Sequence, residues 1–92
     1  MSYRLRIASQ AIKDIERHKK SGDKTILRKI ADLLEELKKH PREGTGQPEK
    51  LKRNLEGFYS RRITKKHRLI YEIEDDIVTV IVVSAYSHYG DK

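Results

Sequence analysis

The part of the chain from Gly44 to Tyr89 contains the side chains with which a protein can cleave RNA. Cleavage without a metal ion uses the substrate's own 2′-hydroxyl, which attacks the adjacent phosphorus. The protein then needs a base for the hydroxyl proton, an acid for the leaving 5′-oxygen, and cations for the added phosphate charge. Glu49 and His88 can fill the roles of base and acid. The cations available for the third role are Lys52, Arg62 and Arg68.

Two other kinds of chemistry fit this sequence poorly. The four histidines show no ligand spacing such as His-x-x-x-His, and no cluster of Asp and Glu lies beside them. Gly44 and Gly46 do not form a phosphate-binding loop, because the Gly-Lys-Ser/Thr signature is missing and no strand and helix flank them. We therefore expect no metal and no other cofactor.

Each candidate also has a structural interpretation, which the residues alone leave open. Glu49 follows a proline and could cap a short helical turn, because a carboxylate is stabilising at a helix N-terminus. His88 lies near the end of the chain, where surface histidines are common. Tyr89 could cover the edge of the core or stack on a base of unpaired RNA. An arginine on a strand commonly faces solvent or pairs with a carboxylate.

The positive charge of the chain is concentrated in its middle. Of a net charge of +7, the segment from Arg42 to Tyr71 supplies +6, with nine Lys and Arg against three acids. A positive field confined to one segment is typical of nucleic-acid binders, because neutralising phosphates releases counterions. A solvated surface is the other interpretation of such a run of charge.

Length and composition narrow the class of protein further. A chain of 92 residues is expected to form one domain, over residues 1–92. The absence of cysteine excludes disulfides and thiolate metal sites. No apolar run reaches the roughly 20 residues of a membrane helix, and the first residues lack an apolar signal segment. We therefore expect a cytoplasmic protein with no membrane association.

The N-terminal elements follow from hydrophobic periodicity. Alternation predicts a strand over residues 3–7, and helical spacing predicts helices over about 9–20 and 25–40. The second helix has an apolar face and a polar face that includes Glu36. It must end before Pro41, which disfavours the helical conformation in the preceding residue.

The rest of the chain predicts a loop and three strands. Residues 42–57 contain three glycines and one proline, which favours a loop. Strand-like runs follow at 58–64, 67–74 and 77–86, and their short connections predict antiparallel hairpins. The last run is apolar on both faces, which favours an interior position. The expected fold is α+β, in the order β-α-α-β-β-β, with the two helices packed on one face of an antiparallel sheet.

Strand alternation also predicts which cations can act together. In the strand over 67–74, Arg68 points away from the face on which the helices pack. Arg61 and Arg62 are neighbours on the preceding strand and therefore point to opposite faces. At most one of them can join Arg68.

The second half of the chain resembles the YoeB/Txe branch of the RelE/ParE-like toxins. The similarity covers half of the chain in unbroken order, whereas the N-terminal half is similar only in its layout of strand and helices. Two departures lie in the segment that positions His88. Tyr86 stands where many relatives carry a basic residue, and Gly90-Asp91-Lys92 follow the tyrosine. The matching pattern is Gly44-x-Gly46-x-Pro48-Glu49-x-Leu51-Lys52-x-Asn54-Leu55-x-Gly57-Phe58-x-Ser60-Arg61-Arg62-Ile63-Thr64, then His67-Arg68-Leu69-x-Tyr71, then His88-Tyr89.

This resemblance implies a RelE-like fold and the toxin of a type II toxin–antitoxin system. The implied activity is that of a metal-independent endoribonuclease, which cleaves mRNA in the A site of the 70S ribosome and inhibits translation. In the family, the residue matching Glu49 is the general base, that matching Arg68 clamps the phosphate, and that matching His88 is the general acid. The supporting positions match Lys52, Arg62 and Tyr89.

The resemblance also implies a protein partner. A YefM-like antitoxin would wrap the toxin with a disordered, acidic C-terminal region and block its basic site. Whether the free toxin is a homodimer is left open.

Two functions from other classes remain open. A ParE-like toxin shares the architecture but acts by binding DNA gyrase, and it would need no acid–base pair. A non-catalytic RNA-binding or ribosome-binding domain would show an affinity that falls steeply with salt, without any cut product.

Overall fold

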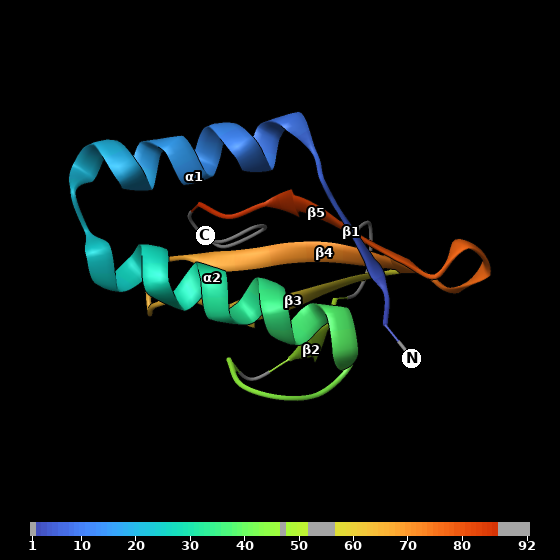
Figure 1. Ribbon diagram of the computed structural model, residues 1–92. Coiled ribbons are helices and arrows are strands. Elements are labelled where there is room, and N and C mark those ends of the chain that lie inside the picture. The colour runs from blue at the N-terminus through green and yellow to red at the C-terminus, as the bar shows by residue number, and fades with distance from the viewer. Residues whose placement is uncertain (1, 47, 52–56, 87–92) are drawn as a thin grey trace.

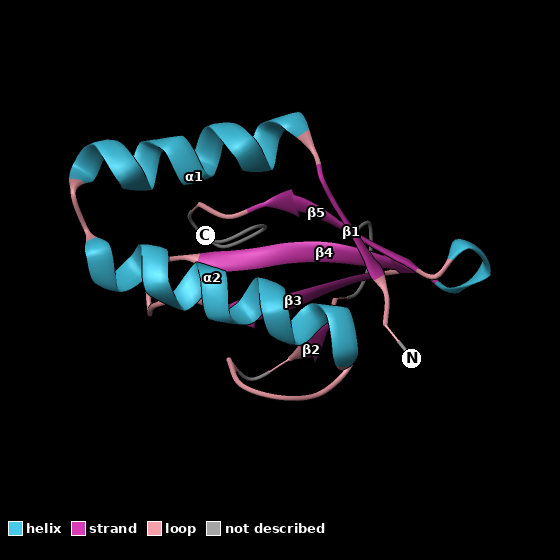
Figure 2. Cartoon of the chain, in the orientation of Figure 1, coloured by secondary structure: helices cyan, strands magenta, loops and turns pink. Residues whose placement is uncertain are grey.

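The computed structural model of the protein describes residues 2–46, 48–51 and 57–86. Both helices lie on the same side of one sheet (Figures 1 and 2). This arrangement confirms the α+β class and the expected order of elements, to which the structure adds one short strand. The elements are β1 (Arg4–Ile7), α1 (Ser9–Ser21), α2 (Lys24–Lys39), β2 (Glu49–Lys50), β3 (Phe58–Arg62), β4 (Arg68–Glu74), a 3₁₀ turn η2 (Asp75–Ile77) and β5 (Thr79–Ser84).

The sheet is mixed, with five strands in the order β1-β5-β4-β3-β2. The two predicted hairpins are confirmed, because β4 pairs antiparallel with both β3 and β5. The first strand differs from the expectation of an antiparallel sheet, since β1 pairs parallel with β5. That pairing gives β5 the interior position that its apolar residues predicted.

The core lies between the helices and one face of the sheet. Helix α2 buries residues at helical spacing, and β4 and β5 bury alternate residues toward it. Burying each large apolar side chain contributes about 1.5–3 kcal/mol. Neither helix of the described chain is long and apolar enough to span a membrane. The facing core residues are Ile26, Ile30, Leu33 and Leu37 on α2, and Leu69, Tyr71, Val80 and Val82 on the sheet.

The predicted loop over 42–57 contains β2, which the sequence did not predict. Glu49 pairs with Ser60 and Lys50 with Tyr59 along the edge of β3. The backbone N–H of Leu51 then donates to the carbonyl of Phe58 at 2.9 Å. The strand forms because the edge of β3 offers unpaired backbone groups. Glu49 therefore belongs to a strand, and the alternative that it caps a helical turn is wrong.

Candidate active site

Strand pairing places four polar side chains on the sheet face that lies away from the helices, here called the open face. Residues directly opposite one another in a sheet share a face, and Arg62 is opposite Arg68 while Ser60 is opposite Glu49. Ser60 and Arg62 are two residues apart on β3, so all four side chains share one face. Arg61 points to the helix side, where it is fully buried. Arg62 is thus the arginine that joins Arg68.

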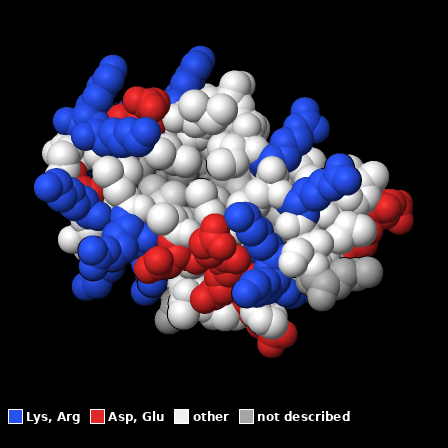
Figure 3. Space-filling view, in the orientation of Figure 1, with Lys and Arg blue, Asp and Glu red and all other residues white. Residues whose placement is uncertain are grey.

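The helix side of the molecule carries side chains of both charges. Figure 3 views the helix side, where Lys and Arg side chains are spread over the surface and a group of acidic side chains lies below the middle, with basic side chains beside it. Such a mixture gives no continuous positive field for a polyanion. The open face, with Arg62 and Arg68 side by side, is therefore the better candidate for contacting phosphates.

A carboxylate and a guanidinium lie beside each other on the open face. Nη1 of Arg68 is 3.5 Å from Oε1 of Glu49 and 3.4 Å from Oγ of Ser60. These distances are long for hydrogen bonds, so neither group is tightly engaged. The Glu49 side chain is 63% exposed and that of Arg68 only 19%. A substrate hydroxyl can therefore reach the carboxylate, while the largely buried guanidinium lies next to it.

Ser60 also belongs to this site, although its residue type alone did not indicate a role there. It is fully buried, yet its hydroxyl oxygen accepts from Arg68 across the hairpin. Strand alternation could have indicated this position, because a residue two positions before Arg62 on a strand lies on the same face as Arg62. Ser60 helps to orient the guanidinium that would meet the phosphate.

Charge on the open face changes sign along β4. Glu72 lies four residues after Arg68, and Glu74 is the next residue on the same face. Burial raises the pKa of Glu72, and a hydrogen bond with Glu74 and the charge of that carboxylate raise it further. A phosphate group is therefore favoured at the arginine end of the face and disfavoured at the carboxylate end.

Helix α1 holds the backbone at Ala85, three residues before the predicted acid His88. The Ala85 N–H donates to Oδ2 of Asp14 at 2.9 Å, and the Ala85 carbonyl lies 2.8 Å from Nε2 of His18. Because a carbonyl can only accept, Nε2 of His18 carries the proton. Asp14 and His18 are both buried, so water does not compete for these bonds.

The side chain of the next residue, Tyr86, also packs against α1 residues. Its ring centroid lies 5.0 Å from that of His18 and 4.5 Å from that of His67. The guanidinium carbon of Arg17 lies 3.7 Å from the centroid of the Tyr86 ring, within cation–π distance. We call these contacts of Ala85 and Tyr86 the C-terminal anchor. The Tyr86 ring is thus held by packing against His18, His67 and Arg17.

The structure brings together three of the six candidates, namely Glu49, Arg62 and Arg68. Among residues 2–46, 48–51 and 57–86, no group of three or more His, Asp or Glu side chains is placed to hold a metal ion. The remaining three candidates lie outside the described residues, and their roles stay predictions. These are Lys52, His88 and Tyr89.

The chain is similar to known toxins over most of its length. A family model for the YoeB-like toxin of bacterial type II toxin–antitoxin systems matches residues 7–89. Toxin YoeB of Escherichia coli is 46% identical over 67 residues, which are 73% of this chain and 77% of that protein.

Solved structures give the same result for the fold. The YoeB/ParE toxin from Agrobacterium tumefaciens has a TM-score of 0.86 and 32% identity, over 94% of this chain and 99% of that one. A chain of the YoeB–YefM toxin–antitoxin complex from Staphylococcus aureus has a TM-score of 0.78 and 38% identity, and the match covers 95% of this chain and 98% of that one.

Two helices on one side of a small mixed sheet are thus an architecture shared with the YoeB/ParE toxin from Agrobacterium tumefaciens, and this similarity places the chain in the class of YoeB-like toxins. The chain belongs to the YoeB family of bacterial type II toxin–antitoxin systems. The resemblance inferred from the second half of the sequence is thereby confirmed, and the family match begins at residue 7.

Proposed function

We propose that this toxin is a metal-independent endoribonuclease that cuts mRNA in the A site of the 70S ribosome and so inhibits translation. The observation that carries the proposal is the position of Glu49 beside Arg68 on the open face, with Arg62 directly opposite Arg68. A base next to two cations is what cleavage by the 2′-hydroxyl requires. The exposure of Glu49 supports the same role, because the carboxylate must meet the substrate.

In the proposed reaction, Glu49 removes the proton of the 2′-hydroxyl, and the oxygen attacks the adjacent phosphorus. The bond from phosphorus to the 5′-oxygen breaks, and His88 gives a proton to that oxygen. The products are a 2′,3′-cyclic phosphate and a 5′-hydroxyl. Tyr89 stacks on a base of the unpaired message. The charge on the phosphate oxygens is stabilised by Arg68, Arg62 and Lys52.

The proposed partners follow from the same site and from the relatives. The similar Staphylococcus aureus toxin is known in a complex with YefM and also as a YoeB dimer. We expect this toxin to bind a YefM-like antitoxin, whose acidic C-terminal region would cover the arginines of the open face. We also expect the free toxin to form a homodimer, and the protein to act in the cytoplasm, where ribosomes translate.

Primer extension on a defined mRNA in a purified translation system tests the proposal. The wild type should give discrete cuts at the A-site codon only when ribosomes are present. Glu49→Gln should lower cleavage by about 100-fold or more, because proton transfer by a positioned base contributes at least that factor. Asp32→Asn removes the same charge from the exposed side of α2 and should cut like the wild type.

Other outcomes of this assay would contradict the proposal in distinct ways. An intact message with blocked translation would indicate a protein that binds RNA or the ribosome without cutting. An intact message with normal translation, together with a DNA-damage response in cells, would indicate a gyrase-binding toxin. Cleavage by Glu49→Gln at the wild-type rate would remove Glu49 from the mechanism.

A further inference from the structure

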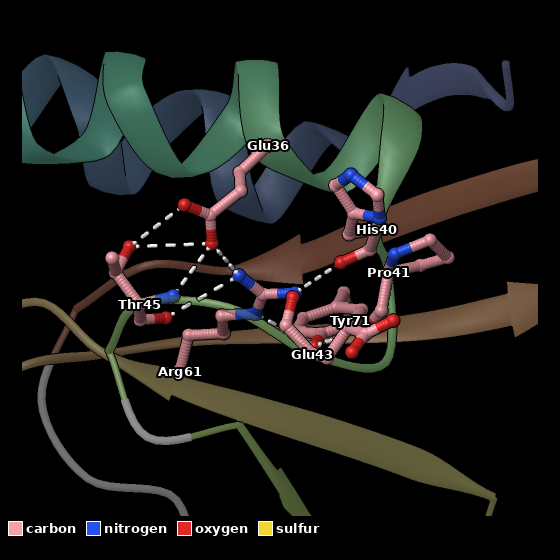
Figure 4. Close-up of polar contacts among 7 residues, drawn as sticks. All are labelled: Glu36, His40, Pro41, Glu43, Thr45, Arg61 and Tyr71. Carbon is pink, nitrogen blue, oxygen red and sulfur yellow. Dashed lines mark hydrogen bonds and ion pairs between the residues drawn. The ribbon is translucent and has the colours of Figure 1, made fainter.

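One buried arginine on the helix side of the sheet holds the segment that leads into Glu49. Arg61 follows Ser60 on β3 and is fully buried. Its side chain points between α2 and the chain that follows this helix (Figure 4). Its neighbour Arg62 faces the open side, so the two arginines act on opposite faces of one strand.

The Arg61 guanidinium uses its full set of donors. Nε donates to the Tyr71 hydroxyl at 3.1 Å. Nη1 donates to the Glu36 carboxylate and, at 3.3 Å, to the Thr45 carbonyl. Nη2 donates to the His40 carbonyl and, at 2.8 Å, to the Glu43 carbonyl. Guanidinium has five N–H donors, and each of these contacts accounts for one.

The Glu36 and Tyr71 side chains also form hydrogen bonds with this segment directly. The Thr45 N–H donates to Oε1 of Glu36 at 2.7 Å, and the Thr45 hydroxyl lies 3.1 Å from Oε2. The Tyr71 hydroxyl donates to the Pro41 carbonyl at 2.8 Å. We call this set of contacts the Arg61 clamp. Residues 40–45 form no helix or strand, so side chains of α2 and the sheet, not a backbone ladder, fix their position.

Two glycines show how closely the segment is held. Gly44 has a φ of 127°, and a Cβ there would overlap the Glu36 carboxylate. Gly46 has a φ of 80°, and a Cβ there would lie 3.0 Å from the Arg62 carbonyl oxygen. The Gly46 carbonyl also accepts from the Arg62 N–H at 2.6 Å. The backbone therefore passes directly against β3 three residues before Glu49.

We propose that Glu36 and Arg61 are positioning residues for Glu49. This inference rests on the proposed function, because it assigns the clamp a part in RNA cleavage. Without the clamp, residues 40–45 lose their side-chain attachments to α2 and the sheet, and the Glu49 carboxylate no longer stays beside Arg68. Displacing a reacting group by about 1 Å costs up to about 100-fold in rate. The loss falls on the cleavage step, since the arginines that contact RNA remain in place.

Glu36→Ala tests the proposal, with Glu36→Gln as the conservative variant. Glu36→Ala should lower the single-turnover rate of cleavage by about tenfold or more. The concentration of ribosome-bound mRNA for half-maximal rate should change by less than about twofold, since binding is intact. Glu36→Gln keeps an oxygen acceptor for Arg61 and Thr45 and should recover most of the rate. Glu35→Ala is the matched control, because the neighbouring Glu35 is 74% exposed and pairs with Lys38 at the surface, away from the clamp.

Amide exchange provides a readout that does not need cleavage. The Thr45 N–H should exchange faster in Glu36→Ala than in the wild type, and at the wild-type rate in Glu35→Ala. Should Glu36→Ala fail to fold, Thr45→Val removes only the hydroxyl contact and should give a smaller loss of rate in the same direction.

Three results would overturn the inference. The first is a folded Glu36→Ala that cuts at the wild-type rate. The second is an equal loss of rate in Glu35→Ala. The third is a Glu36→Ala that needs a higher concentration of ribosome-bound mRNA for half-maximal rate but has an unchanged maximal rate. A wild type that does not cut would instead overturn the proposed function. In that case the Thr45 exchange would still show whether the clamp holds its segment.

Discussion

Two irregular segments precede proposed catalytic residues in the chain, residues 40–46 before Glu49 and residues 85–86 before His88, and they are held in different ways. The first is fixed by a buried cation, Arg61, which binds a carboxylate and several backbone carbonyls. The second is fixed by Asp14, His18 and the packed rings around Tyr86.

The first attachment depends on α2 and the second on α1. This difference shows that the helices do more than cover the core. Each helix holds one of the two segments, so the attachments that precede the proposed base and the proposed acid can be disturbed separately.

The largest expected effect comes from the centre of the Arg61 clamp. Arg61→Ala should lower the free energy of unfolding by about 3–5 kcal/mol, because it leaves the Glu36 charge and three backbone carbonyls without their partner. Arg62→Ala, the adjacent residue on the open face, should change it by less than about 0.5 kcal/mol. Urea unfolding measures both, and similar losses in the two variants would contradict the assignment of the two faces.

An intermediate effect is expected at the C-terminal anchor. Asp14→Ala leaves the Ala85 N–H buried without its acceptor and should cost about 1–3 kcal/mol in the free energy of unfolding. Exchange of the Ala85 amide should accelerate, while that of Thr45 should not change. An effect of Asp14→Ala on Thr45 would show that the two attachments are not independent.

The pH dependence of stability distinguishes the charged clamp from the anchor. Burial alone would raise the pKa of Glu36, but hydrogen bonds from Thr45 and the charge of Arg61 outweigh burial and hold it below the ordinary 4.5. A carboxyl group whose pKa is lowered by folding stabilises the protein above its ordinary pKa. That contribution is lost as pH falls through the lower, folded value.

The difference in free energy of unfolding between the wild type and Glu36→Gln should therefore shrink as pH falls below about 4.5. Urea unfolding across the acidic range measures this difference. If it stays constant with pH, the charge of Glu36 has no part in holding the segment.

The smallest effect is expected at the surface of the anchor. Arg17→Ala removes the cation beside the Tyr86 ring and should cost about 0.5–1 kcal/mol. Arg28→Ala, at an exposed position of α2, serves as the control in thermal unfolding. Equal losses in the two variants would show that the ring contact of Arg17 contributes nothing.

Local rules were sufficient for much of the fold. The apolar spacing of α2 predicted the face that contains Ile30 and Leu33, and the short connections predicted both hairpins. Alternation also predicted that only one of two adjacent arginines could join Arg68. The position of β1 beside β5 was not predictable, because it pairs residues from opposite ends of the chain, which no local pattern reports.

The attachments were hidden from the sequence for a related reason. Glu36 belongs to the polar face of a helix and Arg61 to a strand, and each residue alone suggests a solvent-facing side chain. Their pairing depends on how α2 crosses the sheet. The two-residue strand β2 likewise forms only because the edge of β3 is there to receive it.

A double-mutant cycle in cleavage rate tests the central claim most directly. Single-turnover rates would be measured for the wild type, Glu36→Ala, Glu49→Gln and the double variant, each shown to be folded. If the Arg61 clamp acts by positioning Glu49, then Glu36→Ala slows the wild type by about tenfold or more but leaves Glu49→Gln unchanged. If Glu36→Ala slows both backgrounds by the same factor, the clamp does not act through Glu49, and the account is wrong.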